Sequence, residues 1–172
     1  MDSRMACHPV HELGPALDWR PLREADLAEV ASLEARIHPS PWSLTNFRDA
    51  LAAGYLAKVG ERRTRIVAYG VLMLAPGEAQ ILNLSVVADA RREGIGRELL
   101  RRFVEDARSL SAEQIFLEVR ASNAPAIGLY ESERFARVAR RVGYYPGAVD
   151  SAAREDALVM RRELSREPPL DR

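Results

Sequence analysis

The spacing of apolar residues changes at Gly54, from the repeat of a helix to the alternation of strands, and this change limits the folds open to the chain. Between residues 24 and 37 the apolar side chains recur at helical spacing, which predicts an amphipathic helix. Pro39 and Pro41 must end that helix, because the residue before a proline is driven away from α geometry. Ser43 is a suitable N-cap for a second helix that Gly54 ends.

The rest of the chain alternates between strand and helix patterns. Strands are expected at residues 16–21, 55–59, 65–74, 79–87, 114–120, 135–142 and 155–163, with a turn at 60–64 and an irregular loop at 143–154. Further helices are expected at residues 94–109 and 123–133. Hairpin-linked strands together with two strand–helix–strand crossovers predict an α/β (α+β) fold. We expect a mixed, largely antiparallel sheet of about six to seven strands, flanked by about four helices.

The composition predicts one domain and excludes several classes of protein. A chain of 172 residues suits a single domain, which we expect at residues 15–164 between tails at 1–14 and 165–172. Its 25 Lys and Arg balance its 25 Asp and Glu, so the charge gives no case for direct nucleic-acid binding. No apolar run approaches the ~18–20 residues of a membrane span, and no secretory signal precedes the domain. With Cys7 as its single cysteine, we expect a cytoplasmic protein.

A strand that runs into a glycine-containing loop and then a helix is the first candidate site. The strand ends at Val87, and Gly94 and Gly96 lie at the expected start of the helix. Glycine lets a backbone approach a ligand closely, and the free N–H groups of a helix start can hold a phosphate. The loop lacks the Gly-Lys-Ser/Thr of a nucleoside-triphosphate site and the third glycine of a dinucleotide site. Taken alone, it could equally be a strand–helix turn with a solvated arginine face.

A second segment, read together with this loop, resembles one family. Residues 91–96, RREGIG, are similar to the acetyl-CoA pyrophosphate loop of the GNAT superfamily of N-acetyltransferases. Residues 118–123, EVRASN, with 126–131, AIGLYE, resemble its RimI type, a branch that acetylates the N-terminal alanine of a small-subunit ribosomal protein. Pro41-Trp42-Ser43 and the arginines before Tyr144-Tyr145-Pro146 match as well, so the resemblance covers about residues 17–164.

The resemblance implies a GNAT fold and a set of site residues. Strand backbone would be offered to the acetyl carbonyl and the pantetheine arm by Leu84, Ser85 and Val86. Backbone N–H groups would bind the pyrophosphate along the loop formed by Arg92, Glu93, Gly94, Ile95, Gly96 and Arg97. Asn123 would contact the cofactor from the next helix, Glu118 would accept the amine proton, and Tyr130 would protonate the departing thiolate.

The chemistry of acyl transfer agrees with these roles, because the attacking amine must be neutral. An α-amine with a pKa near 7.7–8.0 is neutral in roughly one molecule in ten at pH 7, whereas lysine, with a pKa of about 10.4, is almost fully charged. A carboxylate such as Glu118 can then suffice as base, directly or through a water. Each residue also has a structural alternative: Glu118 as a strand carboxylate paired with an arginine, Tyr130 as a core-edge aromatic, and Asn123 as a helix cap.

Other residues are candidates for substrate or metal binding. The aromatic candidates for the acceptor site are Trp42, Tyr144 and Tyr145. Trp42 could instead only plug the junction between the first two helices. Cys7, His8 and His11 resemble a metal cluster, but three ligands without a fourth partner nearby predict no metal site.

These features predict an enzyme that transfers an acetyl group from acetyl-CoA to the N-terminal α-amine of a protein, with alanine preferred and a small-subunit ribosomal protein as partner. Two other functions remain: the same fold acting on a small-molecule amine or a lysine side chain, and a non-catalytic acetyl-CoA sensor. The chain departs from the family at Glu133-Arg134, where Leu-Gly is usual, so the turn into Phe135 must form without glycine. Gly143 looks inserted before the two tyrosines.

Overall fold

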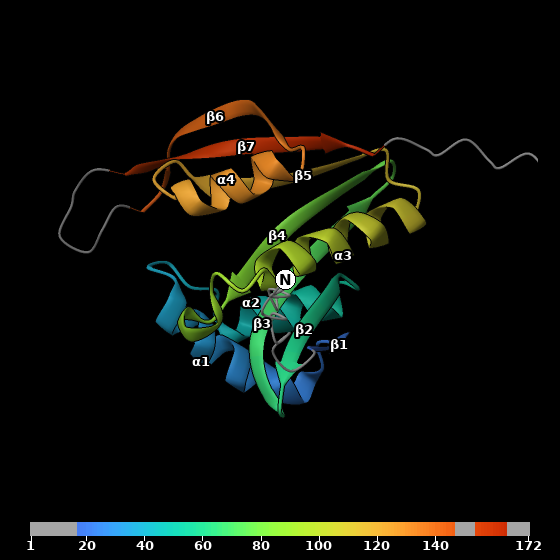
Figure 1. Cartoon of the computed structure of the whole chain (residues 1–172), viewed down its shortest axis with the longest axis vertical. Helices are drawn as coiled ribbons and strands as arrows, with labels where there is room; N and C mark the ends of the chain where they lie inside the picture. The colour runs from blue at the N-terminus through green and yellow to red at the C-terminus, as the bar shows by residue number, and fades with distance from the viewer. Residues whose placement is uncertain (1–16, 147–153, 165–172) are drawn as a thin grey trace, which may run out of the picture.

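Seven strands form a single sheet in the order β1-β2-β3-β4-β5-β7-β6 in the computed structural model, which describes residues 17–146 and 154–164 (Figure 1). The strands are β1 (Asp18–Pro21), β2 (Leu56–Arg62), β3 (Arg65–Ala75), β4 (Glu78–Val86), β5 (Gln114–Arg120), β6 (Ala136–Tyr145) and β7 (Glu155–Glu163). The helices are α1 (Leu27–Ile37), α2 (Leu44–Ala52), α3 (Ile95–Ser109) and α4 (Ala124–Ser132), with short 3-10 turns at Glu24–Asp26 and Ala88–Ala90. This architecture confirms the predicted fold class. The predicted tails lie outside the described residues.

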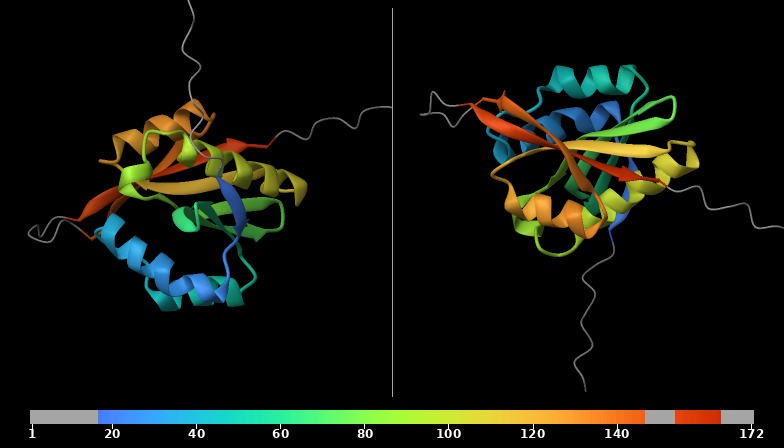
Figure 2. Two further views of the ribbon diagram at one scale, coloured as in Figure 1. Left: turned by 60° about the horizontal axis from the view of Figure 1, so that its bottom comes forward. Right: turned by 90° about the horizontal axis from the view of Figure 1, so that it is seen from above.

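The sheet is antiparallel at every pairing except that of β4 with β5, which is parallel. Helices α1 and α2 lie on one face of the sheet, and α3 and α4 lie on the other (Figure 2). Residues of α3 that lie on one stripe are buried against the sheet: Ile95, Leu99, Leu100, Phe103, Val104 and Ala107. The amphipathic pattern read from the sequence therefore defines the packed face of this helix. Within the described residues, no helix is long and apolar enough to cross a membrane.

The start of two helices is fixed by the caps that the sequence predicted. Ser43 accepts a hydrogen bond from the backbone N–H of Asn46, whose side chain in turn accepts from the backbone N–H of Ser43. Asn123 accepts from the backbone N–H of Ala126 at 3.3 Å, and Pro125 lies in the first turn of α4. Each cap satisfies one of the N–H groups that a helix start leaves without an acceptor.

Strands β4 and β5 separate beyond their first few residues, and this separation positions the site. They pair in parallel only from Glu78 opposite Gln114 to Ile81 opposite Leu117. A bulge follows directly, because Asn83 pairs with Val71 of β3 and Ile81 with the next residue, which leaves Leu82 without a partner in that register. Bulges bend a strand and occur often beside active sites. The ends of both strands therefore face a gap rather than each other.

Two predicted boundaries were wrong. The turn expected at 60–64 is reduced to Arg63 and Thr64, both with positive φ, because Arg62 pairs with Arg65 and extends both strands. This primed two-residue turn matches the twist of a hairpin, so it needs no longer loop.

The loop expected at 143–154 is also shorter at its start, because β6 continues through Tyr145, which pairs with Glu155 of β7. Gly143 has φ +59 and accommodates the irregularity, while its N–H donates to Asp156 Oδ1 at 2.7 Å. Tyr144 and Tyr145 therefore extend from a strand instead of an irregular loop. The described residues resume at Arg154.

The turn from α4 into β6 forms without glycine, as the sequence predicted. Arg134 supplies the left-handed residue, with φ +66. Its N–H donates to Glu131 O, and the N–H of Phe135 donates to Tyr130 O, each at 3.0 Å.

Candidate active site

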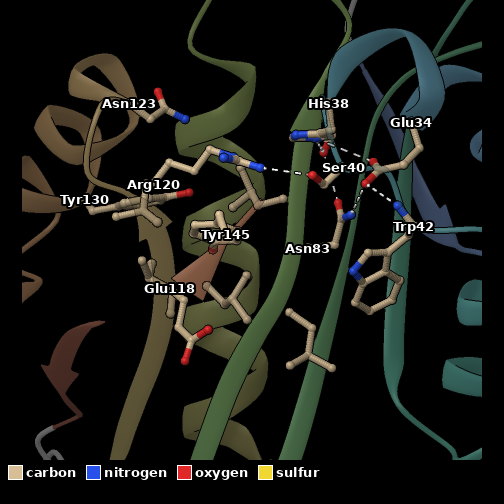
Figure 3. Close-up of a pocket in the computed structure, with 16 residues that line it drawn as sticks. Glu34, His38, Ser40, Trp42, Asn83, Glu118, Arg120, Asn123, Tyr130 and Tyr145 are labelled. Atoms are coloured by element: carbon tan, nitrogen blue, oxygen red, sulfur yellow. Dashed lines mark hydrogen bonds and ion pairs between the residues drawn. The ribbon is translucent and has the colours of Figure 1, made fainter. Parts of the chain in front are cut away.

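A pocket of about 170 Å³ opens between the separated ends of β4 and β5 (Figure 3). One wall carries residues from β5, α4 and β6, among them Glu118, Asn123, Tyr130 and Tyr145. The other wall carries residues from α1, the segment after α1, and β4: Glu34, His38, Ser40, Trp42, Asn83 and Ser85. Figure 3 shows the labelled members of these two groups facing each other across the gap. The pocket brings together residues of α1, the segment after it, β4, β5, α4 with its cap, and β6.

Glu118 faces the pocket from β5, but it is not a free carboxylate. Arg141 Nε lies 3.0 Å from Glu118 Oε1, and the hydroxyl of Tyr144 donates to the same carboxylate. This second bond, with burial of the phenol, raises the pKa of Tyr144 above its ordinary value. The side chain of Glu118 is 15% exposed, whereas that of Arg141 is 55% exposed. The arginine pairing anticipated as a structural alternative is present, and the carboxylate still lines the pocket.

Tyr130 and Asn123 lie on the same wall, contributed by α4 and its cap. Tyr130 is 7% exposed, and burial raises the pKa of its phenol to about 12. Its ring packs against Phe135, so it is also the core-edge aromatic of the alternative interpretation. Asn123 caps α4 with its oxygen and lines the pocket at the same time. In both residues the structural role and the position in the pocket coexist.

The backbone of β4 presents an open edge toward the gap. Val87 N–H donates to Val67 O of β3 at 3.0 Å, and alternate residues of a strand direct their backbone groups to opposite edges. Leu84 and Val86 therefore turn their N–H and C=O groups away from β3, and the Val86 oxygen accepts from Arg91 Nε at 3.2 Å. Ser85 points its backbone toward β3, opposite Tyr69. Of the three strand residues predicted to meet the cofactor by backbone, two face the gap.

The loop before α3 brings a helix start to this edge. Gly94 is the N-cap of α3 with φ +83, a conformation that favours glycine, and the first helical bond runs from Glu98 N–H to Gly94 O. The N–H groups of Ile95 to Arg97 precede that bond and have no acceptor within the helix. A Cβ built on Gly96 would lie 3.6 Å from Val86 and from Leu129, so the helix start sits directly against β4 and α4.

Most side chains of the same loop form contacts with other parts of the protein. Glu93 forms an ion pair with Arg62. Arg97 Nε lies 3.0 Å from Glu133 Oε1, which turns this guanidinium toward the end of α4. Arg92 is exposed with φ +67. A phosphate at this loop would therefore be held mainly by backbone N–H groups and the positive end of the helix.

These features fit acetyl-CoA as a ligand. Its extended arm carries amide groups that can pair with the open edge of β4, and its pyrophosphate suits the start of α3. The described residues contain no group of three His, Cys, Asp or Glu side chains that could hold a metal ion. Cys7, His8 and His11 lie outside the described residues.

A network of hydrogen bonds around a buried carboxylate supports the pocket wall formed by α1 and β4, and it was not predicted from the sequence. Glu34 is 2% exposed, and it accepts from Tyr69 Oη at 2.7 Å and from Asn83 Nδ2 at 3.1 Å. The backbone N–H of Trp42 also donates to it, at 3.2 Å. Burial, and then the bond to Glu34, raise the pKa of Tyr69 far above its ordinary value. Trp42 packs on Phe47 at 5.2 Å between ring centroids, so it plugs the helix junction and lines the pocket as well.

Arg120 connects the two walls and was also missed. Its Nη1 donates to Glu155 Oε2 at 2.9 Å and to Pro146 O at 3.2 Å. Its Nη2 donates to Ser40 Oγ at 3.2 Å, across the gap (Figure 3). The guanidinium also lies 4.4 Å from the ring centroid of Tyr145, and burial raises the pKa of that phenol to about 12.

The fold and the site together define a CoA-dependent acyltransferase. The sequence profile of the acetyltransferase (GNAT) family matches residues 21–134. The ribosomal protein bS18-alanine N-acetyltransferase of Escherichia coli strain K12 is 34% identical over 144 residues, covering 84% of this chain and 95% of that protein. The enzyme of the same description from Salmonella typhimurium is 35% identical over 144 residues, with the same two coverages.

Solved structures agree with the sequence comparison. The crystal structure of the Escherichia coli ribosomal-protein-S18-alanine N-acetyltransferase has a TM-score of 0.81 and 31% identity, and the match covers 91% of this chain and 99% of that one. A Salmonella typhimurium structure that contains acetyl-CoA as its cofactor shares the fold, with a TM-score of 0.72 and 19% identity over 91% of this chain and 98% of that one. The chain belongs to the acetyltransferase (GNAT) family and takes its acetyl group from acetyl-CoA.

Proposed function

We propose that this protein acetylates the N-terminal α-amine of a ribosomal protein, with alanine as the first residue, and that the acceptor is the bS18 protein of the cytoplasmic small ribosomal subunit. The observation that carries the proposal is the presence of Glu118 and Tyr130 on one wall of a pocket whose other side holds the open edge of β4. The relatives named for activity on bS18 support the choice of acceptor. The N-terminal ammonium enters between the two walls.

Each group then has one task in a direct transfer. Acetyl-CoA supplies an acetyl group activated as a thioester. Backbone N–H groups near Leu84 and Val86 hold the donor and polarise its carbonyl. Glu118 accepts a proton from the amine nitrogen, and Tyr130 delivers the proton of its hydroxyl to the departing sulfur. Because burial raises the pKa of Tyr130 to about 12, this phenol stays protonated through the neutral range.

Arg141 and Tyr144 hold the Glu118 carboxylate until the acceptor arrives. Arg141 is more than half exposed, so it can move aside at low cost when the substrate ammonium approaches. The ammonium then takes the place of one cation beside Glu118. This exchange positions the amine next to the group that accepts its proton.

The test compares two matched peptides by mass spectrometry. One begins with a free alanine followed by arginine, and the other is blocked at its α-amine and carries only an internal lysine. The proposal expects acetylation of the first alone, and loss of that activity by about 10²- to 10⁴-fold in Glu118→Gln. Acetylation of the lysine peptide would show that the enzyme acts on side-chain amines. Failure of both peptides while acetyl-CoA still binds would favour a small-molecule acceptor or a sensor.

A further inference from the structure

His38, the residue that ends α1, lies in the pocket wall that faces Glu118 (Figure 3). Its Nε2 is 2.7 Å from Ser85 Oγ and 3.6 Å from Glu34 Oε2. Its side chain keeps 37% of its surface exposed, and this surface borders the pocket. The ring is therefore held at one nitrogen and accessible elsewhere.

The hydrogen bonds that start at Glu34 fix the proton on this ring. A carboxylate only accepts, so Asn83 turns its Nδ2 toward Glu34 and leaves its Oδ1 for Ser85. The single hydroxyl proton of Ser85 is donated to Asn83 Oδ1 at 3.0 Å. Ser85 Oγ must then accept from His38, so Nε2 carries the hydrogen. In the neutral ring, Nδ1 is consequently an unprotonated acceptor.

The surroundings of His38 keep the ring neutral at pH 7. Burial lowers the pKa of His38 below its usual 6.5, against the opposing charge of Glu34. The cations Arg91 and Arg120 lower the pKa further. The charged groups that act on it are Glu34 on α1, Arg91 before α3 and Arg120 on β5, and Tyr69 on β3 is bonded to Glu34. The titratable groups on the opposite wall of the pocket are Glu118, Tyr130 and Tyr145. Among the described residues, His38 Nδ1 has no hydrogen-bond partner.

We propose that His38 Nδ1 is a second proton acceptor of this site, one that takes the first proton from the acceptor α-ammonium; the inference rests on the proposed function. The nitrogen must lose two protons, one before it attacks and one as the C–N bond forms and the C–S bond breaks. His38 takes the first at Nδ1 and releases it to solvent. Glu118 takes the second proton. The sulfur leaves with the electron pair of the C–S bond and receives a proton from Tyr130. The proton held by Glu118 then reprotonates Tyr130. One proton is released overall.

The buried network supports this role on both sides of the transfer. Before it, Ser85 holds the tautomer that leaves Nδ1 free. After it, the imidazolium lies 3.6 Å from the Glu34 carboxylate, whose charge stabilises the cation. Glu34 itself is unsuited to the task, because Tyr69, Asn83 and the Trp42 N–H already occupy its oxygens.

The variant His38→Gln separates chemistry from packing. The glutamine amide can still donate to Ser85, but it has no titratable nitrogen. On the alanine-starting peptide, we expect kcat/KM at pH 7 to fall about 10- to 100-fold and the deficit to vanish near pH 9, where the α-amine is already neutral. The matched variant Glu118→Gln should stay impaired at pH 9, because the proton that Glu118 accepts leaves the amine nitrogen only as the C–N bond forms. A His38→Gln deficit that does not change with pH would overturn the proposal.

A second measurement needs no turnover. Nitrogen-15 NMR of the free protein should find His38 neutral at pH 7 with the hydrogen on Nε2, and Ser85→Ala should weaken that preference. A ring protonated on Nδ1 at pH 7 would overturn the inference. If the acceptor were a lysine instead, the wild-type peptide assay would reveal it, and the His38→Gln deficit would then vanish only above about pH 11, where the lysine amine is neutral. Failure of the acceptor assignment and failure of His38 are thus distinguishable.

Discussion

Glu118 on β5 and Arg141 on β6 form an ion pair of 3.0 Å that reaches across β7, the strand lying between them. The register places the small, fully buried Ala157 of β7 opposite Arg141. The edge strand β6 therefore contributes to the orientation of a carboxylate two strands away.

Replacing Arg141 tests this coupling. Arg141→Ala should lower kcat/KM about fivefold, because the free enzyme then no longer holds the Glu118 carboxylate in place before the acceptor arrives, and should have almost no further effect in Glu118→Gln. Arg137→Ala is the matched control, since Arg137 lies on the same strand and pairs with Glu131 at 2.8 Å, outside the pocket. Equal losses for Arg141→Ala in both backgrounds would show that the pair does not act through Glu118.

Tyr130→Phe removes the proposed proton donor with little change in packing. Among the described residues, no group hydrogen-bonds the Tyr130 hydroxyl, so the melting temperature should change little, whereas kcat should fall about 10²-fold. Because the pKa of the phenol is raised to about 12, the wild-type rate should show no loss attributable to Tyr130 ionisation up to pH 10. Pre-steady-state kinetics would measure the rate of the chemical step and its pH dependence, and thermal unfolding would give the melting temperature. An unchanged chemical step in Tyr130→Phe would exclude Tyr130 as the acid.

Gly94 and Gly54 offer a matched pair for testing whether the loop before α3 binds the cofactor phosphate. Their φ angles are +83 and +77, and a Cβ on either would meet no atom within 4 Å, but only Gly94 begins α3. Each change to alanine should lower the free energy of unfolding by about 1 kcal/mol, because an L-residue is strained at this φ. Only Gly94→Ala should raise the KM for acetyl-CoA, by about five- to tenfold, measured at saturating peptide. Equal KM values in the two variants would contradict a role for this helix start.

The sequence predicted the regular elements well because their signals are local. The alternation at 114–120 and the helical stripe after Gly94 reproduce β5 and α3 almost residue for residue. The wrong boundaries occur where hydrogen bonding between strands extends into residues whose polar composition is typical of a loop. Polar residues at 60–64 resemble a loop, yet strand pairing extends through Arg62 and leaves only Arg63 and Thr64 to turn.

The candidate site also contains residues that a local sequence pattern can predict and residues that only the fold brings together. Glu118, Asn123 and Tyr130 fall within one short segment, so a resemblance in that segment could find them together. Glu34 lies 35 residues from Tyr69 and 49 from Asn83, and no local pattern joins such partners. One signal was present: Glu34 interrupts the apolar stripe of α1 between Val30 and Ile37, at a position that faces the core. A carboxylate there requires buried donors.

Tyr69→Phe measures what those donors contribute. The Tyr69 hydroxyl donates to a Glu34 carboxylate that is 2% exposed, and a hydrogen bond to a buried charge is worth about 1.5–3 kcal/mol. Denaturant unfolding should therefore give a free energy lower by that amount. Tyr55→Phe is the control, since within the described part of the chain the Tyr55 side chain makes no hydrogen bond; it should cost less than about 0.5 kcal/mol. If the two variants unfolded at the same denaturant concentration, Glu34 would not depend on Tyr69. A larger loss of unfolding free energy for Tyr69→Phe than for Tyr55→Phe would establish that the hydrogen bond from Tyr69 to the buried Glu34 carboxylate stabilises this wall of the pocket.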